Sequence, residues 1–127
     1  MDEGKDKLKK EFKLRLYRFV IRLLKFLTQL PNSPVIREIK SQLVRSGTST
    51  GANYFEAEAA SSKKDYQNFF HHCLKSTNET KFWLACLRDS DLVPNNLLEE
   101  CNYLLEEGKE MANIFASSLI TMKGKRK

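Results

Sequence analysis

The stretch Arg45-Ser46-Gly47-Thr48-Ser49-Thr50-Gly51-Ala52-Asn53-Tyr54-Phe55-Glu56-Ala57 decides the fold of this chain. Its Gly, Ser and Thr residues are weak helix formers, and each Gly costs about 1 kcal/mol relative to Ala. Polar residues nevertheless recur at the spacing of one helix face, namely Arg45, Ser49, Asn53 and Glu56. A polar face on a helix between two apolar helices predicts a buried polar network, because buried polar groups must satisfy one another.

We expect this network to tie the segment to the helix that follows it. Arg45 would pair with Glu56 or with Glu79, since an unpaired buried charge is costly. Ser49 and Asn53 would satisfy the remaining donors. A second interpretation, a small-molecule or catalytic site in the core, stays open, although no His near Ser49 in the motif could serve as its base. The small residues beside the polar face would let a neighbouring backbone approach closely: Ser46, Gly47, Thr50 and Gly51.

Four helical segments are predicted, at about 6–30, 34–60, 62–89 and 94–122. Pro31 and Pro34 separate the first two, and Ser33 caps the second. Ser62-Lys63-Lys64-Asp65 resembles a capping box before the third. Long helices with short connections predict an all-α fold, an antiparallel up-down-up-down four-helix bundle. A chain of 127 residues fits a single domain, with residues 123–127 as a basic tail.

The first helix carries three stripes. The core seam recurs at spacings of four and three: Phe12, Leu16, Phe19, Leu23, Phe26 and Leu30. A second apolar stripe is wider than one core needs and predicts an oligomer interface; its members are Leu14, Tyr17, Ile21 and Leu24. The third stripe is mostly basic and predicts an exposed cationic ridge: Lys7, Glu11, Arg15, Arg18, Arg22 and Lys25.

Charge is unevenly distributed along the chain. The net charge is +6, yet residues 28–122 hold nine basic and twelve acidic residues. Both ends are basic, which favours contact with a polyanion such as a nucleic acid. The alternative is a solvated helix face and tail. The candidate nucleic-acid-binding residues are Lys7, Lys10, Arg15, Arg18, Arg22, Lys25, Lys123, Lys125, Arg126 and Lys127.

Several other functions find no support in the sequence. No apolar run approaches the roughly 20 residues of a membrane span, and the charged N-terminus is not a secretory signal. Cys73, Cys86 and Cys101 have no metal or disulfide spacing, which favours reduced packing residues in a cytoplasmic protein. Consecutive residues of His71-His72-Cys73 point about 100° apart on a helix and do not converge. We therefore expect no enzyme activity, no metal and no cofactor.

Several short motifs together resemble a known family, and they lie between about Phe12 and Leu119. The motifs are Gln42-Leu43-Val44-Arg45-Ser46-Gly47-Thr48-Ser49, Asn53, Glu56-Ala57, Ser62-Lys63-Lys64-Asp65-Tyr66, Leu74-Lys75, Glu79-Thr80 and Trp83-Leu84. This combination is similar to the four-helix-bundle proteins encoded in intervening sequences of bacterial 23S ribosomal RNA genes. Thr50 departs from the Ile often found at its position.

The resemblance implies a homopentameric ring of left-turning four-helix bundles. It also implies a relationship to the accessory variability determinant of diversity-generating retroelements, a basic pentamer that binds a reverse transcriptase and nucleic acid. The expected partners are thus other copies of the chain and RNA, with a reverse transcriptase as a further candidate. The expected function is RNA or ribonucleoprotein binding through basic surfaces; the alternatives are docking onto a reverse transcriptase and a purely structural role.

Overall fold

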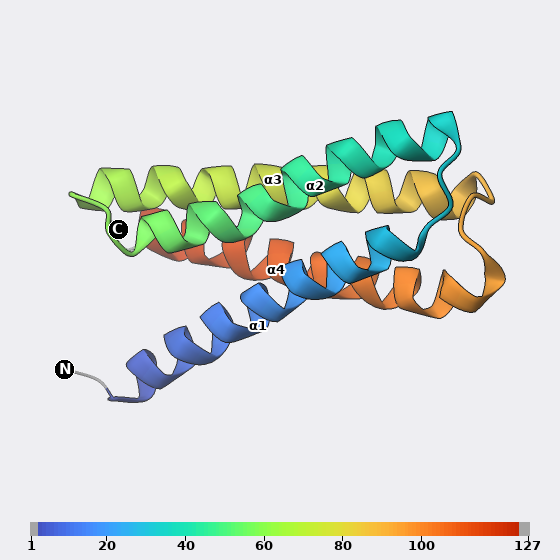
Figure 1. Cartoon of the computed structure of the whole chain (residues 1–127). Helices are drawn as coiled ribbons and strands as arrows, with labels where there is room; N and C mark the ends of the chain where they lie inside the picture. The colour runs from blue at the N-terminus through green and yellow to red at the C-terminus, as the bar shows by residue number, and fades with distance from the viewer. Residues whose placement is uncertain (1–2, 125–127) are drawn as a thin grey trace.

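Four long helices account for most of the chain in a computed structural model that describes residues 3–124. They are α1 (Glu3–Gln29), α2 (Pro34–Ala57), α3 (Lys63–Asp89) and α4 (Leu98–Gly124), with a short 3-10 turn, η1 (Asn95–Leu97), before α4. Consecutive helices are packed against each other, and α2, α3 and α4 run side by side while α1 diverges toward its N-terminus (Figure 1). The all-α up-down bundle is confirmed.

The helix ends follow the expected local chemistry. The Ser33 hydroxyl accepts a hydrogen bond from the Ile36 amide at 3.2 Å, with Pro34 at the first helical position. The Ser62 hydroxyl likewise accepts from the Asp65 amide at 3.1 Å. At the fourth position of this predicted capping box, the Asp65 carboxylate accepts a hydrogen bond from the Ser61 hydroxyl rather than from the Ser62 amide.

The end of α2 differs from the prediction, whereas the end of α3 at Asp89 agrees with it. Helix α2 ends at Ala57 rather than at about residue 60, because the amides of the next residues bond to carbonyls three positions back. Helix α3 ends in a Schellman motif. The amides of Asp91 and Leu92 donate to the carbonyls of Arg88 and Leu87, at 3.2 and 3.1 Å, and Asp91 adopts φ 58°.

The core follows the predicted heptad stripes. Leu16, Phe19, Leu23 and Phe26 of α1 are at most 2% exposed. The predicted stripe of α4 is buried as well, from Cys101 through Leu119. At the open end of the bundle, an aromatic cluster joins all four helices; its members are Phe12, Tyr54, Phe70 and Phe115.

The two glycines of α2 allow α1 to approach closely. A Cβ atom on Gly47 would lie 2.3 Å from Cδ2 of Leu23, and one on Gly51 would lie 3.2 Å from Cγ2 of Val20. Close contact is made here by side chains of α1, whereas a neighbouring backbone was expected.

Helix α1 leaves the bundle where its core stripe loses its apolar residues. One heptad before Phe12 and Leu16, the stripe holds Lys5 and Lys9. Residues 3–11 are all exposed, whereas burial begins at Leu16. Lysine side chains are seldom buried without a partner, so the N-terminal part of α1 stays helical without packing fully onto the other helices.

Candidate nucleic-acid interface

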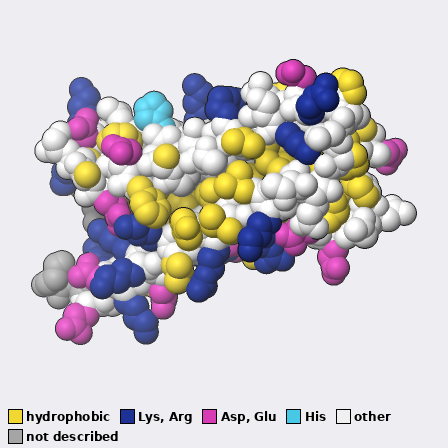
Figure 2. Space-filling view, viewed as in Figure 1, with side chains coloured by type: hydrophobic (Ala, Val, Ile, Leu, Met, Phe, Trp, Pro, Cys, Tyr) yellow, Lys and Arg dark blue, Asp and Glu magenta, His cyan; other side chains and the backbone are white. Residues whose placement is uncertain are grey.

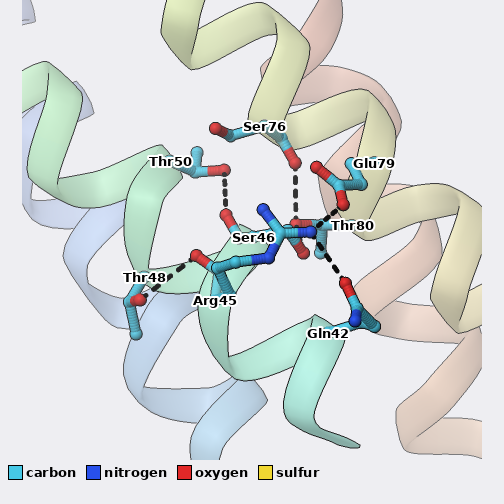
Figure 3. A network of polar contacts seen from close by, with 8 residues as sticks. All are labelled: Gln42, Arg45, Ser46, Thr48, Thr50, Ser76, Glu79 and Thr80. Carbon is cyan, nitrogen blue, oxygen red and sulfur yellow. Dashed lines mark hydrogen bonds and ion pairs between the residues drawn. The ribbon is translucent and has the colours of Figure 1, made fainter. Parts of the chain in front are cut away.

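The predicted buried network around Arg45 is wrong in its membership. Arg45 and Glu56 are both exposed, and Arg45 pairs with Glu79 rather than with Glu56. Its guanidinium also donates to the Gln42 side chain at 2.9 Å, as Figure 3 shows. This hydrogen bond from Arg45 is the main cause that lowers the pKa of Glu79. The arginine lies over the α2–α3 seam, where water can reach it.

The buried polar layer consists instead of four small hydroxyl residues, of which Ser46 and Thr50 were expected only to allow close approach. Ser46, Thr50, Thr77 and Thr80 are all 0% exposed. Thr80 Oγ1 lies 2.9 Å from both Ser46 Oγ and the Ser76 carbonyl oxygen, and the Thr50 hydroxyl donates to the Ser46 carbonyl (Figure 3). Because short hydroxyls can bond the helix backbone one turn away, α2 and α3 pack closely without burying a charge.

The other predicted members of the network are only partly buried. The Asn53 side-chain amide donates to the Ser49 carbonyl at 2.8 Å, a bond within α2. Among residues 3–124, neither side chain forms a hydrogen bond to α3, since both lie beside the seam rather than inside it. The buried hydroxyl layer does have a signal in the sequence. Ser46 and Thr50 are four residues apart, and Thr77 and Thr80 are three residues apart, so each pair lies on one face of its helix.

The basic ridge on α1 is divided between paired and unpaired cations. Arg15 forms a bidentate pair with Glu107, at 2.7 and 2.8 Å, and also contacts Glu110. Arg22 forms a second bidentate pair with Glu100, at 2.6 and 2.9 Å. The ridge was predicted to be exposed, as Arg22 is, but Arg15 is partly buried and the pairing of both arginines with α4 was not predicted. The hydrogen bonds to Glu107 and Glu100 raise the pKa of Arg15 and Arg22, respectively.

The register of these pairs could have been found in the sequence. Arg15 and Arg22 are seven residues apart, and so are Glu100 and Glu107 on the antiparallel α4. Tyr103 lies between the two glutamates, and the Arg22 guanidinium carbon is 3.6 Å from the centre of its ring. A groove of about 410 Å³ runs along this α1–α4 seam.

Four of the predicted cations on α1 have no hydrogen-bond or ion-pair partner among residues 3–124. They are Lys7, Lys10, Arg18 and Lys25, and all are exposed. On a helical wheel they lie on the side opposite the core stripe. Lys123 is exposed in the last turn of α4. The predicted sites at Lys125, Arg126 and Lys127 lie outside the described residues.

The predicted oligomer stripe lies on the same outer side of α1. Leu14 and Tyr17 are 46% and 52% exposed, while Ile21 and Leu24 are partly buried. Tyr17 also lines a groove against α2 with Phe55. Figure 2 shows hydrophobic side chains gathered along this α1–α2 face and basic side chains along the N-terminal part of α1.

The described residues hold little that suggests catalysis. Between residues 3 and 124, no group of three or more His, Cys, Asp or Glu side chains is placed to hold a metal ion. His71 and His72 are both exposed, whereas Cys73 is buried and burial raises its pKa to about 12. None of the described helices combines the length and apolar character that crossing a bilayer requires.

Comparisons with known proteins agree with the fold and the motifs. The family model described as 23S rRNA-intervening sequence protein matches residues 11–114. A crystal structure of a protein of unknown function from the S23 ribosomal protein family, from Bacteroides thetaiotaomicron, is 31% identical. The match covers 84% of this chain and 96% of that one, with a TM-score of 0.72. No curated protein matches significantly. The chain belongs to the family of 23S rRNA-intervening sequence proteins.

Proposed function

We propose that this protein is a non-enzymatic, oligomeric bundle that binds RNA, alone or within a ribonucleoprotein, through the outer face of α1. The observation that carries the proposal is the row of unpaired cations formed by Lys7, Lys10, Arg18 and Lys25. From Lys7 to Lys25 the row spans about 27 Å of helix. Phosphates on one strand of a duplex recur about every 3.4 Å along the axis, so the row reaches several of them.

The two paired arginines contribute to RNA binding in a different way from the four unpaired cations. Arg15 and Arg22 are held by carboxylates of α4, so their charge is largely balanced. Their role in the proposal is to fix α1 against α4. Arg18 and Lys25 then stand on the packed part of α1, which reduces the conformational entropy lost on binding.

The oligomer is part of the same proposal. The exposed stripe that begins with Leu14 and Tyr17 would be covered by another copy of the chain, as the family resemblance suggests, and five copies would form a ring. Arg18 and Lys25 flank this stripe on the wheel, so they would border the subunit contact. In a closed ring the fields of the repeated cations add.

The decisive experiment is an RNA-binding titration over a range of salt concentrations, with the mass of the protein measured by light scattering. Four phosphate contacts predict a log-log salt slope of about −3 to −4, depending on whether the RNA is single-stranded or duplex. Reversing Lys7, Lys10, Arg18 and Lys25 to Glu should abolish binding and leave the melting temperature nearly unchanged.

A matched control uses exposed cations on other helices. Arg37 of α2 and Lys75 of α3 are exposed, and their reversal to Glu should reduce RNA affinity only slightly. Reversal of Arg15 and Arg22 is a poor test, because it would place new carboxylates beside Glu107 and Glu100. Equal losses in the α1 variant and in the control variant would refute a specific role for the α1 face.

A protein partner is the second candidate function, and the groove between α1 and α2 favours it. This groove of about 320 Å³ is lined largely by apolar or small residues, including Tyr17, Val20, Ala52 and Phe55. A reverse transcriptase of a retroelement is one such partner. A well-formed oligomer that binds no RNA at about 50 mM salt, where such contacts are strong, would favour this alternative.

A further inference from the structure

A separate groove lies at the turn between α2 and α3, where the N-terminal half of α1 passes nearby. Its volume is about 450 Å³. Residues of three helices line it together with the turn: Lys9, Tyr54, Ala57, Glu58, Ala60, Ser61, Ser62, Lys63 and Tyr66. None of the functions proposed above uses it.

Tyr54 is the most informative residue in this groove. Its side chain is only 4% exposed, and its ring packs against Phe12 and Phe70, with centroids 5.3 and 5.8 Å away. Its hydroxyl has no hydrogen-bond partner among the described residues. Among residues 3–124, only Nε1 of Trp83 is a side-chain polar atom that is shut off from solvent and has no partner. The Tyr54 hydroxyl is therefore not shut off from solvent, and it opens onto the groove that Tyr54 lines.

The Tyr54 hydroxyl is available as a donor. Burial raises the pKa of Tyr54 to about 12, which keeps the phenol protonated at neutral pH. Because the hydroxyl has no protein partner among the described residues, it can donate a hydrogen bond to an acceptor oxygen that replaces water in the groove.

The surroundings of this hydroxyl favour an anion. The groove contains the start of α3, a helix of 27 residues, and its Lys63 and Lys64 amides have no acceptor in the described structure. Free amides and the helix dipole both attract negative charge at such a position. Lys9 and Lys63 line the same groove, and neither side chain has a hydrogen-bond or ion-pair partner among residues 3–124.

The nearby carboxylates are already engaged. Glu58 pairs with Lys13 at 2.6 Å, and Asp65 accepts the Ser61 hydroxyl at 2.6 Å. The charge of Glu58 is therefore balanced locally, while Lys9 and Lys63 are left to attract a ligand. Compact anions with several acceptor oxygens suit a set of donors that come from three helices.

We propose that this groove binds a phosphate monoester, with the Tyr54 hydroxyl, the Lys9 and Lys63 ammonium groups and the first amides of α3 as its donors. The terminal phosphate of an RNA and the phosphate of a small metabolite share this chemistry. The site does not depend on the outer face of α1, so either proposal can fail without the other.

The first test titrates the whole protein with inorganic phosphate at constant ionic strength and follows binding by phosphorus NMR. Tyr54→Phe keeps the packed ring and removes the hydroxyl, and Lys63→Gln changes an exposed side chain. Each variant should bind phosphate about fivefold to tenfold more weakly than the unmodified chain. Tyr103→Phe and Lys75→Gln are matched controls outside the groove and should bind normally.

A second measurement distinguishes the sources of the phosphate. It compares a ten-nucleotide RNA that carries a 5′-phosphate with the same RNA ending in a 5′-hydroxyl, and with a nucleoside monophosphate. A preference for the phosphorylated RNA that disappears in Tyr54→Phe assigns the site to RNA ends. Equal binding of the monophosphate assigns it to small ligands. Absence of saturable phosphate binding, or undiminished binding in both groove variants, would overturn the proposal.

Discussion

The two halves of α1 differ although they form one continuous helix. From Leu16 onward the helix buries its core stripe, with Leu23 and Phe26 both 0% exposed. From Glu3 to Glu11 every residue is exposed, and Leu8 is 67% exposed. The comparison separates the formation of a helix from its packing onto the bundle. The helical conformation depends on local propensity along the whole segment, whereas packing against the other helices depends on whether the residues of one stripe are apolar.

Charge pairing divides along the same helix. In the packed half, Arg15 and Arg22 are tied to carboxylates of α4. In the exposed half, Lys7 and Lys10 have no partner in the described structure. The packed half therefore anchors the helix, and the exposed half presents free positive charge, which is where we place much of the RNA contact.

The largest difference between the halves should appear when one leucine is truncated in each. Leu23→Ala leaves a cavity in the core and should lower the free energy of unfolding by about 2–5 kcal/mol. Leu8→Ala is the matched substitution in the exposed half and should change it by about 0.5 kcal/mol or less. Chemical denaturation of both variants measures the difference. Similar losses would show that residues 3–11 pack in solution.

A smaller loss of unfolding free energy is expected when an added methyl group separates α1 from α2. Gly47→Ala places a methyl group against Leu23, which is fully buried and has little room to move. Overpacking costs about 1–3 kcal/mol, and better helix propensity offsets about 1 kcal/mol. The net loss should be about 1 kcal/mol in a thermal or urea melt. Gly51→Ala is the control; its nearest neighbour is 3.2 Å away, so it should be neutral or stabilising.

The architecture could be read from the sequence because it depends on repeated patterns. The seam of α1 and the stripe of α4 recur with heptad spacing, and Ser33 and Ser62 are standard helix caps. The Schellman motif around Asp91 could not be read so easily. It depends on a positive φ at Asp91, a conformation that Asp tolerates but that an Asp in the sequence does not predict.

The polar details were harder to predict than the core. Arg45, Ser49, Asn53 and Glu56 share one face, yet periodicity alone does not tell which side of a polar helix is buried. Size decides it here, because Ser46 and Thr50 fit between closely packed helices and an arginine does not. The loss expected for Arg45→Ala is therefore that of an exposed pair rather than of a buried one.

The exposed half can be made to resemble the packed half. Lys9→Leu restores an apolar residue at a core-stripe position, beside a groove against α4 lined by Ile114 and Met122. Burial of part of a leucine, reduced by the entropy of ordering the helix, should stabilise the protein by up to about 1 kcal/mol. Hydrogen exchange should show slower exchange of the amides near residue 9. Lys10→Leu, on the outer side, is the control, and equal protection in both variants would contradict the stripe argument.

The smallest effect concerns the ion pairs that anchor the middle of α1. Glu107→Gln keeps the shape of a residue that is 13% exposed and removes the charge that Arg15 contacts. Because Arg15 is 37% exposed, water and salt screen the pair, and the loss should be about 0.5–1 kcal/mol at low salt. It should shrink at about 1 M salt, where the Debye length is about 3 Å. Glu106→Gln removes a more exposed charge, paired with Lys109 in the same helix, and serves as the control. A loss for Glu107→Gln that persists in high salt would mean that packing, and not charge, holds this half of α1 in place.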